Sequence, residues 1–336
     1  MGQETQNTQR QESQTSSFFK NEIQPIRNFK DASIISAEQF DPINLQVVFY
    51  EADRAKEGVK KRLEDKCLSG FMLATLFYRP STRTRLAFEA AMHRLGGKVI
   101  SESGVEFSSI IKGEQLPDTI RVVEGFVDVI ALRHPDKGSA AIAADFAKIP
   151  IINAGDGPGE HPTQALLDLY TIQQKFGKID GLTITFLGDL KKGRTVHSLV
   201  KLLSHYQVRI NFVAPQFLQI PKEFTDQLQQ KGIEVVKSNR LDELNSGFDV
   251  IYVTRLQEEF YKDDPNSSAI IANLKNSYNL PPDFAEKSKA LVMHPLPRVN
   301  EIPAEIDNSP QAIYFEQSRN GLYVRMALLK LVLLGN

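Results

Sequence analysis

The chain of 336 residues contains a single cysteine, Cys67, so no disulfide can form within it. It contains no CxxC or HExxH pattern, which excludes the zinc sites that those motifs build. It also lacks an apolar run long enough to cross a membrane, because the best candidate, residues 322–334, is short and includes Arg325 and Lys330. We therefore expect a soluble protein of a reducing compartment, the cytoplasm, that binds neither a membrane nor a metal.

The sequence lacks a charge excess of either sign. Lys and Arg total 40, Asp and Glu total 41, and the net charge is −1. Proteins that bind nucleic acid normally carry a clear basic excess, so we expect no nucleic-acid partner, and any basic site must be local. The hydrophobic and charged fractions, 41% and 24%, are typical of a globular protein, and the length favours two domains.

The first 24 residues contain almost no aliphatic side chains and are rich in Gln, Ser, Thr and Asn. Such a segment cannot bury enough apolar surface to fold, so we predict a disordered polar tail over residues 1–24. A secretory signal would need an apolar centre, and an organelle transit peptide would avoid acids such as Glu4 and Glu12. Neither kind of targeting segment is therefore expected.

Short aliphatic or β-branched runs alternate with helical patterns through the rest of the chain. We predict strands at residues 71–77, 99–101, 127–132, 149–152, 182–187, 209–213, 234–236, 248–253 and 290–293. This alternation indicates parallel sheets with helices on both faces, so the predicted fold is α/β, with two doubly wound parallel-sheet domains joined by helices. We place the domains at residues 25–176 and 177–315, and expect a last helix, 316–336, to return to the first domain.

The most informative segment is Ser81-Thr82-Arg83-Thr84-Arg85, where the first predicted strand gives way to a helix. A helix start has free backbone N–H groups and a partial positive charge, which favour an anion. A Ser or Thr here is often only a helix cap, but two Arg side chains in the first turn oppose the helix dipole. A phosphate or similar oxyanion would compensate them, so we predict an anion site.

Further polar clusters follow other predicted strands. They are Arg133-His134-Pro135, the segment 155–164 with His161 and Gln164, the segment 188–194 with Arg194, Thr254-Arg255-Leu256-Gln257, and His294-Pro295-Leu296-Pro297-Arg298. The carboxyl ends of parallel strands are where α/β proteins bind ligands. The Arg side chains of these clusters, together with Arg83 and Arg85, predict a small polyanionic ligand. The clusters contain no Ser-His-Asp or Cys-His signature, so we expect catalysis by positioning and electrostatic stabilisation, without a cofactor.

These motifs resemble those of the aspartate carbamoyltransferases, the pyrimidine-pathway members of the transcarbamoylase group, over residues 35–334. The stretch 77–85 resembles the carbamoyl-phosphate motif of the whole group. His161-Pro162-Thr163-Gln164 and His294-Pro295-Leu296-Pro297-Arg298 resemble the aspartate branch, since the ornithine branch usually carries a Cys in each of these segments. Cys67 lies elsewhere, which disfavours an ornithine enzyme.

The resemblance implies transfer of the carbamoyl group of carbamoyl phosphate to L-aspartate, giving N-carbamoyl-L-aspartate and phosphate in de novo pyrimidine (UMP) biosynthesis. It makes residues 25–176, completed by helix 316–336, the carbamoyl-phosphate-binding domain, and residues 177–315 the aspartate-binding domain. The implied carbamoyl phosphate ligands are Ser81, Thr82, Arg83, Thr84, Ser108, Lys112, Arg133, His161, Gln164, Leu296 and Pro297. The implied aspartate ligands are Lys112, Arg194, Arg255 and Gln257.

Within the carbamoyl phosphate set, the resemblance implies particular roles. Thr84, Arg133 and His161 would polarise the carbonyl oxygen and so act as catalytic residues. Gln164 and the backbone carbonyl of Leu296 would receive the carbamoyl amide, and the Leu296-Pro297 bond would be cis, as in relatives. The amine of aspartate would then attack the carbamoyl carbon directly, through a tetrahedral oxyanion.

The segment 108–114 resembles a family loop that reaches into the active site of a neighbouring subunit. The resemblance therefore implies a homotrimer with shared active sites, in which Ser108 and Lys112 act across the interface. It leaves open whether regulatory chains or another enzyme of the pathway bind the trimer.

Three other interpretations stay open. A transcarbamoylase for another amino acid, such as ornithine, would differ in the group that Arg255 and Gln257 meet. A noncatalytic sensor of a phosphate metabolite on the same fold would be expected to lack part of the implied site, and no member of that set is missing. A dinucleotide-binding oxidoreductase is disfavoured, because residues 188–193 lack the GxGxxG spacing.

Overall fold

The computed structural model describes residues 25–104, 112–244, 247–258, 261 and 278–336. The predicted tail, 1–24, and Ser108 lie outside the described residues. All nine predicted strands are present, and each strand pair in the described part of the chain is parallel. The predicted α/β fold with two parallel sheets is therefore confirmed.

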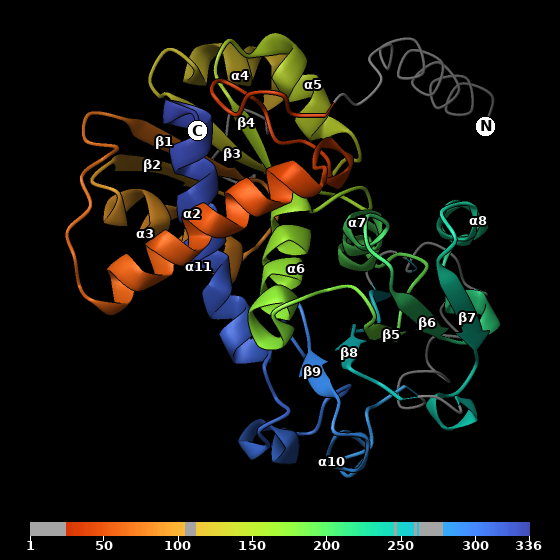
Figure 1. Cartoon of the computed structure of the whole chain (residues 1–336). Coiled ribbons are helices and arrows are strands. Elements are labelled where there is room, and N and C mark those ends of the chain that lie inside the picture. The colour runs from red at the N-terminus through yellow and green to blue at the C-terminus, as the bar shows by residue number, and fades with distance from the viewer. Residues whose placement is uncertain (1–24, 105–111, 245–246, 259–260, 262–277) are drawn as a thin grey trace, which may run out of the picture.

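The first sheet has the strand order β2-β1-β3-β4. Its strands are β1 (Met72–Phe77), β2 (Lys98–Ser103), β3 (Val129–His134) and β4 (Ile151–Asp156), and the helices around it are η1 (Ala37–Gln39), α2 (Pro42–Lys60), α3 (Thr82–Arg94), α4 (Leu116–Val123) and α5 (Ser139–Phe146). Alternate residues of β1 face opposite sides: Phe77 shares an apolar cluster with Phe88 of α3, whereas Leu76 shares another with Ile120 of α4. Helices thus cover both faces, with α4 and α5 on the face away from α3 (Figure 1).

The second sheet has the order β7-β6-β5-β8-β9. Its strands are β5 (Thr183–Leu187), β6 (Arg209–Val213), β7 (Glu234–Ser238), β8 (Val250–Val253) and β9 (Leu291–Met293), and the helices around it are α7 (Arg194–Leu203), η3 (Gln216–Leu218), α8 (Lys222–Gln230), η4 (Leu241–Glu243), α10 (Phe284–Ser288) and η6 (Ala304–Asn308). Tyr252 of β8 clusters with Leu199 of α7, and its neighbour Val253 clusters with Ala285 of α10. Both faces of this sheet are therefore buried as well.

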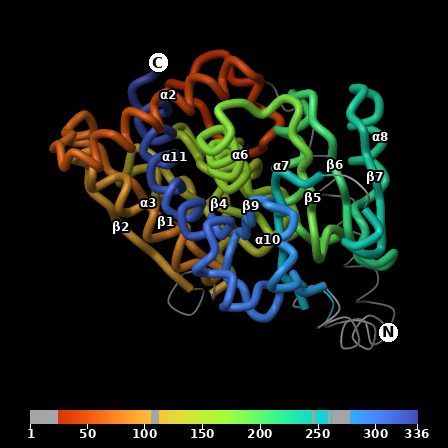
Figure 2. The backbone as a smooth tube through the Cα atoms, turned by 60° about the horizontal axis from the view of Figure 1, so that its bottom comes forward, coloured from red at the N-terminus to blue at the C-terminus, as the bar shows by residue number. Residues whose placement is uncertain are grey.

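Two long helices connect the sheets. Helix α6 (Pro162–Phe176) runs from β4 toward β5, and Figure 2 shows it between the elements of the first sheet and those of the second. Helix α11 (Tyr314–Leu334) follows β9 and packs against α2, α3 and α6. One apolar cluster extends from α11 across α6 to α7, so the two halves share a core.

Within the described ranges, none of the helices combines the length and the apolar character that a membrane crossing needs.

Cys67 is partly buried, and burial together with the neighbouring Asp65 raises the pKa of its thiol to about 12. At that pKa a thiolate nucleophile is not available near neutral pH.

Candidate active site

A cavity of about 620 Å³ lies where the carboxyl ends of strands from both sheets face each other. It brings together every described residue that the family resemblance implies as a ligand, except Lys112. These residues are Ser81, Thr82, Arg83, Thr84, Arg133, His161, Gln164, Arg194, Arg255, Gln257, Leu296 and Pro297. Lys112 is exposed and does not line the cavity of its own chain.

The start of α3 forms one wall of the cavity. Ser81 occupies the N-cap position, but its side chain makes no capping hydrogen bond, so its hydroxyl is available to a ligand. Thr84 is buried, and burial lowers the pKa of Arg83. Arg85 points elsewhere: it lies outside the cavity lining and pairs with Glu89 at 3.7 Å. The expectation that Arg85 contributes to the anion site is therefore wrong, because its helical neighbour one turn later draws it to the outer face.

Arg133 and Arg194 meet above the end of β4. The Nη1 of Arg133 donates to the Ala154 carbonyl at 3.1 Å, and the Nη1 of Arg194 donates to the Gly157 carbonyl at 2.5 Å. Gly155 lies beneath both, with φ of +116°, and a Cβ there would come within 3.0 Å of Arg133 and 3.2 Å of Arg194. A glycine is thus required both by the backbone conformation and by the close approach of the two guanidiniums.

The cavity is strongly basic. Burial, followed by the charges of Arg194, Arg79 and Arg83, lowers the pKa of Arg133 to about 9. Among the described residues that line the cavity there is no Asp or Glu to compensate these cations. Mutual repulsion of this kind is relieved by an anionic ligand, so the geometry favours a small molecule with several negative charges.

His161 is neutral in this environment. Burial and the nearby charges of Arg194, Arg133 and Arg325 lower its pKa well below the usual value. Its Nδ1 atom is buried and has no hydrogen-bond partner in the described part of the chain. A neutral imidazole can donate its single N–H to a developing oxyanion without changing the charge of the site.

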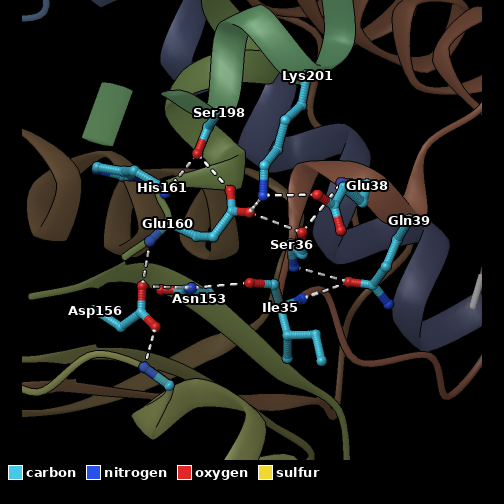
Figure 3. Close-up of polar contacts among 11 residues, drawn as sticks. Ile35, Ser36, Glu38, Gln39, Asn153, Asp156, Glu160, His161, Ser198 and Lys201 are labelled. Atoms are coloured by element: carbon cyan, nitrogen blue, oxygen red, sulfur yellow. Dashed lines mark hydrogen bonds and ion pairs between the residues drawn. The ribbon is translucent and has the colours of Figure 1, made fainter. Parts of the chain in front are cut away.

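A polar cluster behind His161 fixes its backbone. The backbone N–H of His161 donates to Ser198 Oγ at 3.0 Å, and Ser198 donates to Glu160 Oε2 at 2.5 Å. Lys201 pairs with the other oxygen of Glu160 and with Glu38 at 2.9 Å. Figure 3 shows Ser198 of α7 between the His161 backbone and the Glu160 carboxylate. The start of α6 is therefore tied to α7 in the other half of the molecule.

The loop after β9 supplies the opposite wall. The peptide bond between Leu296 and Pro297 is cis, as predicted. The backbone N–H of Leu296 donates to His294 Nδ1 at 2.8 Å, which leaves the proton of the neutral ring on Nε2 for Glu301, also 2.8 Å away. The conformation of the loop is thus set by a buried histidine.

The second sheet contributes the ends of β5 and β8. Arg194 begins α7, and Arg255 and Gln257 follow β8. The Nε2 of Gln257 donates to the Lys192 carbonyl at 2.7 Å, and its backbone N–H donates to Asp189 at 3.2 Å. These bonds hold the β8 loop against the β5 loop, so that Arg194 and Arg255 line one cavity.

Several residues that line the cavity lie outside the segments singled out in the sequence. They are Leu167, Thr195, Gln317, Ser318 and Arg325. Gln317 and Arg325 come from α11, which the sequence predicts only as a helix that returns to the first domain. A signal was present, because a buried Arg within an apolar helix is unusual. No cluster of three or more His, Cys, Asp or Glu side chains within the described ranges could hold a metal ion.

Comparisons with known proteins give a consistent result. Residues 32–174 match the family model described as aspartate/ornithine carbamoyltransferase, carbamoyl-P binding domain, and residues 180–332 match its Asp/Orn binding domain. The chain is 47% identical to the aspartate carbamoyltransferase catalytic subunit of Methanocaldococcus jannaschii over 304 residues, covering 90% of this chain and 98% of the relative. It is 46% identical to the chloroplastic aspartate carbamoyltransferase of Arabidopsis thaliana, covering 92% of this chain and 80% of the relative.

A solved structure extends this similarity to the fold. Aspartate transcarbamoylase from Trypanosoma cruzi, in complex with carbamoyl phosphate and aspartate, superposes with a TM-score of 0.85 at 41% identity. The match covers 93% of this chain and 100% of that chain.

Proposed function

The chain belongs to the aspartate/ornithine carbamoyltransferase family, and from this we propose that it transfers the carbamoyl group of carbamoyl phosphate to the amine of L-aspartate. The products are N-carbamoyl-L-aspartate and phosphate, which makes the protein a carbamoyl-group transferase of de novo pyrimidine biosynthesis. The observation that carries this proposal is the cavity itself, basic, without a carboxylate in its described lining, and with a neutral His161.

The basic lining favours aspartate over ornithine. Aspartate presents two carboxylates, and Arg194 and Arg255 lie on the side of the cavity that the second sheet supplies. Ornithine would place a side-chain ammonium among these guanidiniums with no described carboxylate to receive it. Like charges at close range in a partly buried site cost several kcal/mol, so the cationic amino acid is rejected.

The reaction needs positioning and charge stabilisation. Ser81, Thr82 and Arg83 bind the phosphate at the start of α3, where the backbone N–H groups are free. Thr84, Arg133 and His161 surround the carbonyl oxygen and stabilise the negative charge that develops as the neutral amine attacks. The tetrahedral oxyanion then collapses, the bond to the phosphate oxygen breaks, and the phosphate leaves with the proton that the attacking amine loses.

The two polar acceptors of the site complete the recognition of the carbamoyl group. Gln164 and the carbonyl of Leu296 accept the two N–H bonds of its amide. Gln257 joins Arg194 and Arg255 in binding the aspartate carboxylates. None of these steps uses a cofactor.

We also propose a homotrimer with shared sites. Lys112 is exposed and outside its own cavity, and it follows β2, which lies at the edge of the first sheet. An edge position is suited to contact with a second subunit, whose cavity would receive Lys112 and Ser108. Several relatives are named catalytic subunits, which supports regulatory chains as further partners. The single unpaired cysteine supports a reducing compartment such as the cytoplasm.

A side-by-side assay tests the proposal. Purified protein is supplied with carbamoyl phosphate and either aspartate or ornithine, and both carbamoylated amino acid and phosphate are measured. We expect transfer to aspartate, and a rate with ornithine at least about a hundredfold lower, as expected from a mispaired buried charge. Preferred transfer to ornithine would overturn the substrate assignment, and binding of carbamoyl phosphate without turnover would favour a sensor.

A further inference from the structure

Asp168 is a buried carboxylate that does not line the cavity and that the reaction described above does not use. It lies on α6, one turn after Gln164, and its side chain is fully buried. It accepts hydrogen bonds from Gln164 Nε2 at 2.8 Å, Gln317 Nε2 at 2.6 Å and the Tyr252 hydroxyl at 2.7 Å. One side chain thus joins α6, α11 and β8.

The two glutamine amides have only one orientation beside this carboxylate. Burial raises the pKa of Asp168 to about 7, while the hydrogen bonds from Tyr252, Gln317 and Gln164 favour its ionised form. That form accepts hydrogen bonds and cannot donate them, so each amide turns its nitrogen toward Asp168. For Gln317 a second partner confirms the orientation, because its oxygen accepts the backbone N–H of His294 at 2.8 Å. For Gln164 the amide oxygen is the group left to face the cavity that this residue lines.

The bond from Gln317 continues toward the substrate. His294 begins the segment that turns through Pro295 to Leu296, and its ring holds the Leu296 backbone N–H at 2.8 Å. The backbone of the loop is therefore anchored at one end by Gln317, which is itself anchored by Asp168.

We infer that Asp168 is a positioning residue for both carbamoyl-amide acceptors: it fixes which end of the Gln164 amide faces the substrate, and through Gln317 it holds the loop that carries the main-chain oxygen of Leu296. The inference rests on the proposed function, which makes these two oxygens the ligands of the substrate amide. The Gln164 oxygen faces the substrate because Asp168 engages the amide nitrogen, whereas the Leu296 oxygen, an acceptor in any case, is held in place through Gln317 and His294.

The consequence concerns which acyl phosphate the site selects. Carbamoyl phosphate carries an NH2 group where acetyl phosphate carries a methyl group of similar size. Only the NH2 group can use the two acceptors, and a methyl group leaves them unpaired. If Gln164 were free to rotate by 180° about its last bond, it would present N–H groups to the substrate NH2, and the preference would be lost.

The experiment compares two probes, freshly prepared carbamoyl phosphate and acetyl phosphate, by calorimetric titration of the full chain. The wild type should bind carbamoyl phosphate on the order of tenfold more tightly, as expected for two hydrogen bonds. In Asp168→Leu both glutamines lose their anchor, and the ratio of the two dissociation constants should fall to within about threefold of unity. Affinity for acetyl phosphate should change by less than about threefold, because the phosphate contacts are intact.

Two matched variants separate orientation from bulk stability. Asp168→Asn keeps one oxygen for the two amides and offers its own NH2 to the Tyr252 hydroxyl. Unlike Asp168→Leu, it should therefore keep the preference for carbamoyl phosphate over acetyl phosphate. Tyr252→Phe removes one bond to Asp168 but leaves both glutamines in place, so it should keep the wild-type ratio even if the protein melts earlier.

Gln317→Met provides a second route if Asp168→Leu does not fold. It frees only the Leu296 loop, so the preference should fall by about threefold, the share of one hydrogen bond. A folded Asp168→Leu or Gln317→Met protein with the wild-type preference would overturn the inference while leaving the proposed function intact. A wild type that transfers the carbamoyl group but shows no preference would likewise overturn only the inference, and a wild type without carbamoyl transfer would overturn both.

Discussion

Arg83 and Arg85 are identical side chains two positions apart on one helix, yet they lie in different surroundings. Both stand in the first turn of α3, and the sequence predicts an anion for both. A spacing of two residues places them about 200° apart around a helix, so only one can face the cavity. Arg83 lines it, while Arg85 meets Glu89 on another face.

We predict that Arg83→Ala lowers kcat/KM by at least about a hundredfold, because a charge-assisted contact to the phosphate is lost in the transition state. The melting temperature without ligand should stay the same or rise slightly, since one of several neighbouring cations is removed from a described lining that holds no Asp or Glu. Steady-state kinetics and thermal unfolding measure the two effects. Arg85→Ala is the control and should keep a near-normal rate, and a comparable loss in both variants would count against the assignment.

His161 gives a prediction about pH. Its pKa is lowered in the folded protein, so below about pH 6.5 the unfolded chain takes up a proton that the folded chain does not. This difference stabilises the unfolded state, and the stability due to His161 is lost as the pH falls. His161→Asn removes this pH dependence. As the pH falls from 7 to 5, the free energy of unfolding of His161→Asn should therefore rise relative to that of the wild type, by up to about 2 kcal/mol. Urea unfolding at several pH values measures this, and parallel curves would contradict it.

At the scale of elements, the strands were predictable because both faces of a parallel sheet are buried and the strands read as apolar runs. The observed strand ends differ from the predicted ones where the strand residues are not apolar. Strand β2 extends to Ser103, beyond the predicted 101, because it is an edge strand with polar, largely exposed residues. Strand β4 ends at Asp156, beyond the predicted 152, because its last four residues include the buried polar side chains of Asn153 and Asp156 and so break the apolar pattern. Polar strand ends are thus a signal of function that an apolar pattern misses.

Helix α7 links the two halves of the site through one face. Arg194, Ser198 and Lys201 are spaced by four and three residues, so they lie on the same side of the helix. Arg194 lines the cavity, Ser198 holds the backbone of His161, and Lys201 holds Glu160. A helix moves as a rigid unit, so the position of His161 depends on that of Arg194.

We predict that Ser198→Ala lowers kcat by roughly tenfold, because the buried N–H of His161 loses its acceptor and the ring is held less firmly. The free energy of unfolding should fall by about 1–3 kcal/mol for the same reason. Ser204→Ala is the matched control, since Ser204 caps the end of the same helix away from the cavity. Kinetics and urea unfolding of the two variants decide the matter, and equal effects on kcat would show that α7 has no special link to His161.

At the scale of the whole molecule, the limits of sequence reasoning concern residues that long-range packing brings together. The motifs at strand ends were visible locally, and the parallel topology places them at one edge. Gln317 and Asp168 are 149 positions apart, and they meet only because α11 returns from the second sheet to pack on α6. The sequence predicts a last helix that returns to the first domain, but not which polar side chain this helix brings to the site.

The proposed trimer leads to a prediction that a single-subunit enzyme cannot imitate. Arg83 lies in the cavity of its own chain, and Lys112 does not. If Lys112 completes the cavity of a neighbour, Lys112→Ala and Arg83→Ala trimers should each be nearly inactive. Subunits of the two kinds, mixed after dissociation and reassembly, should regain activity, because some interfaces then pair an intact Arg83 with an intact Lys112.

The size of the recovery follows from the symmetry. In a ring of three subunits with two kinds of chain, only one junction has the productive orientation, so at most about one site in three is active. A charge tag on one variant separates the hybrid trimers, and their specific activity is compared with that of each parent. Hybrids that form but stay as inactive as their parents would show that Lys112 does not act across the interface. A specific activity well above one third of that of the wild-type trimer would mean that Arg83 and Lys112 are not both required at the same site.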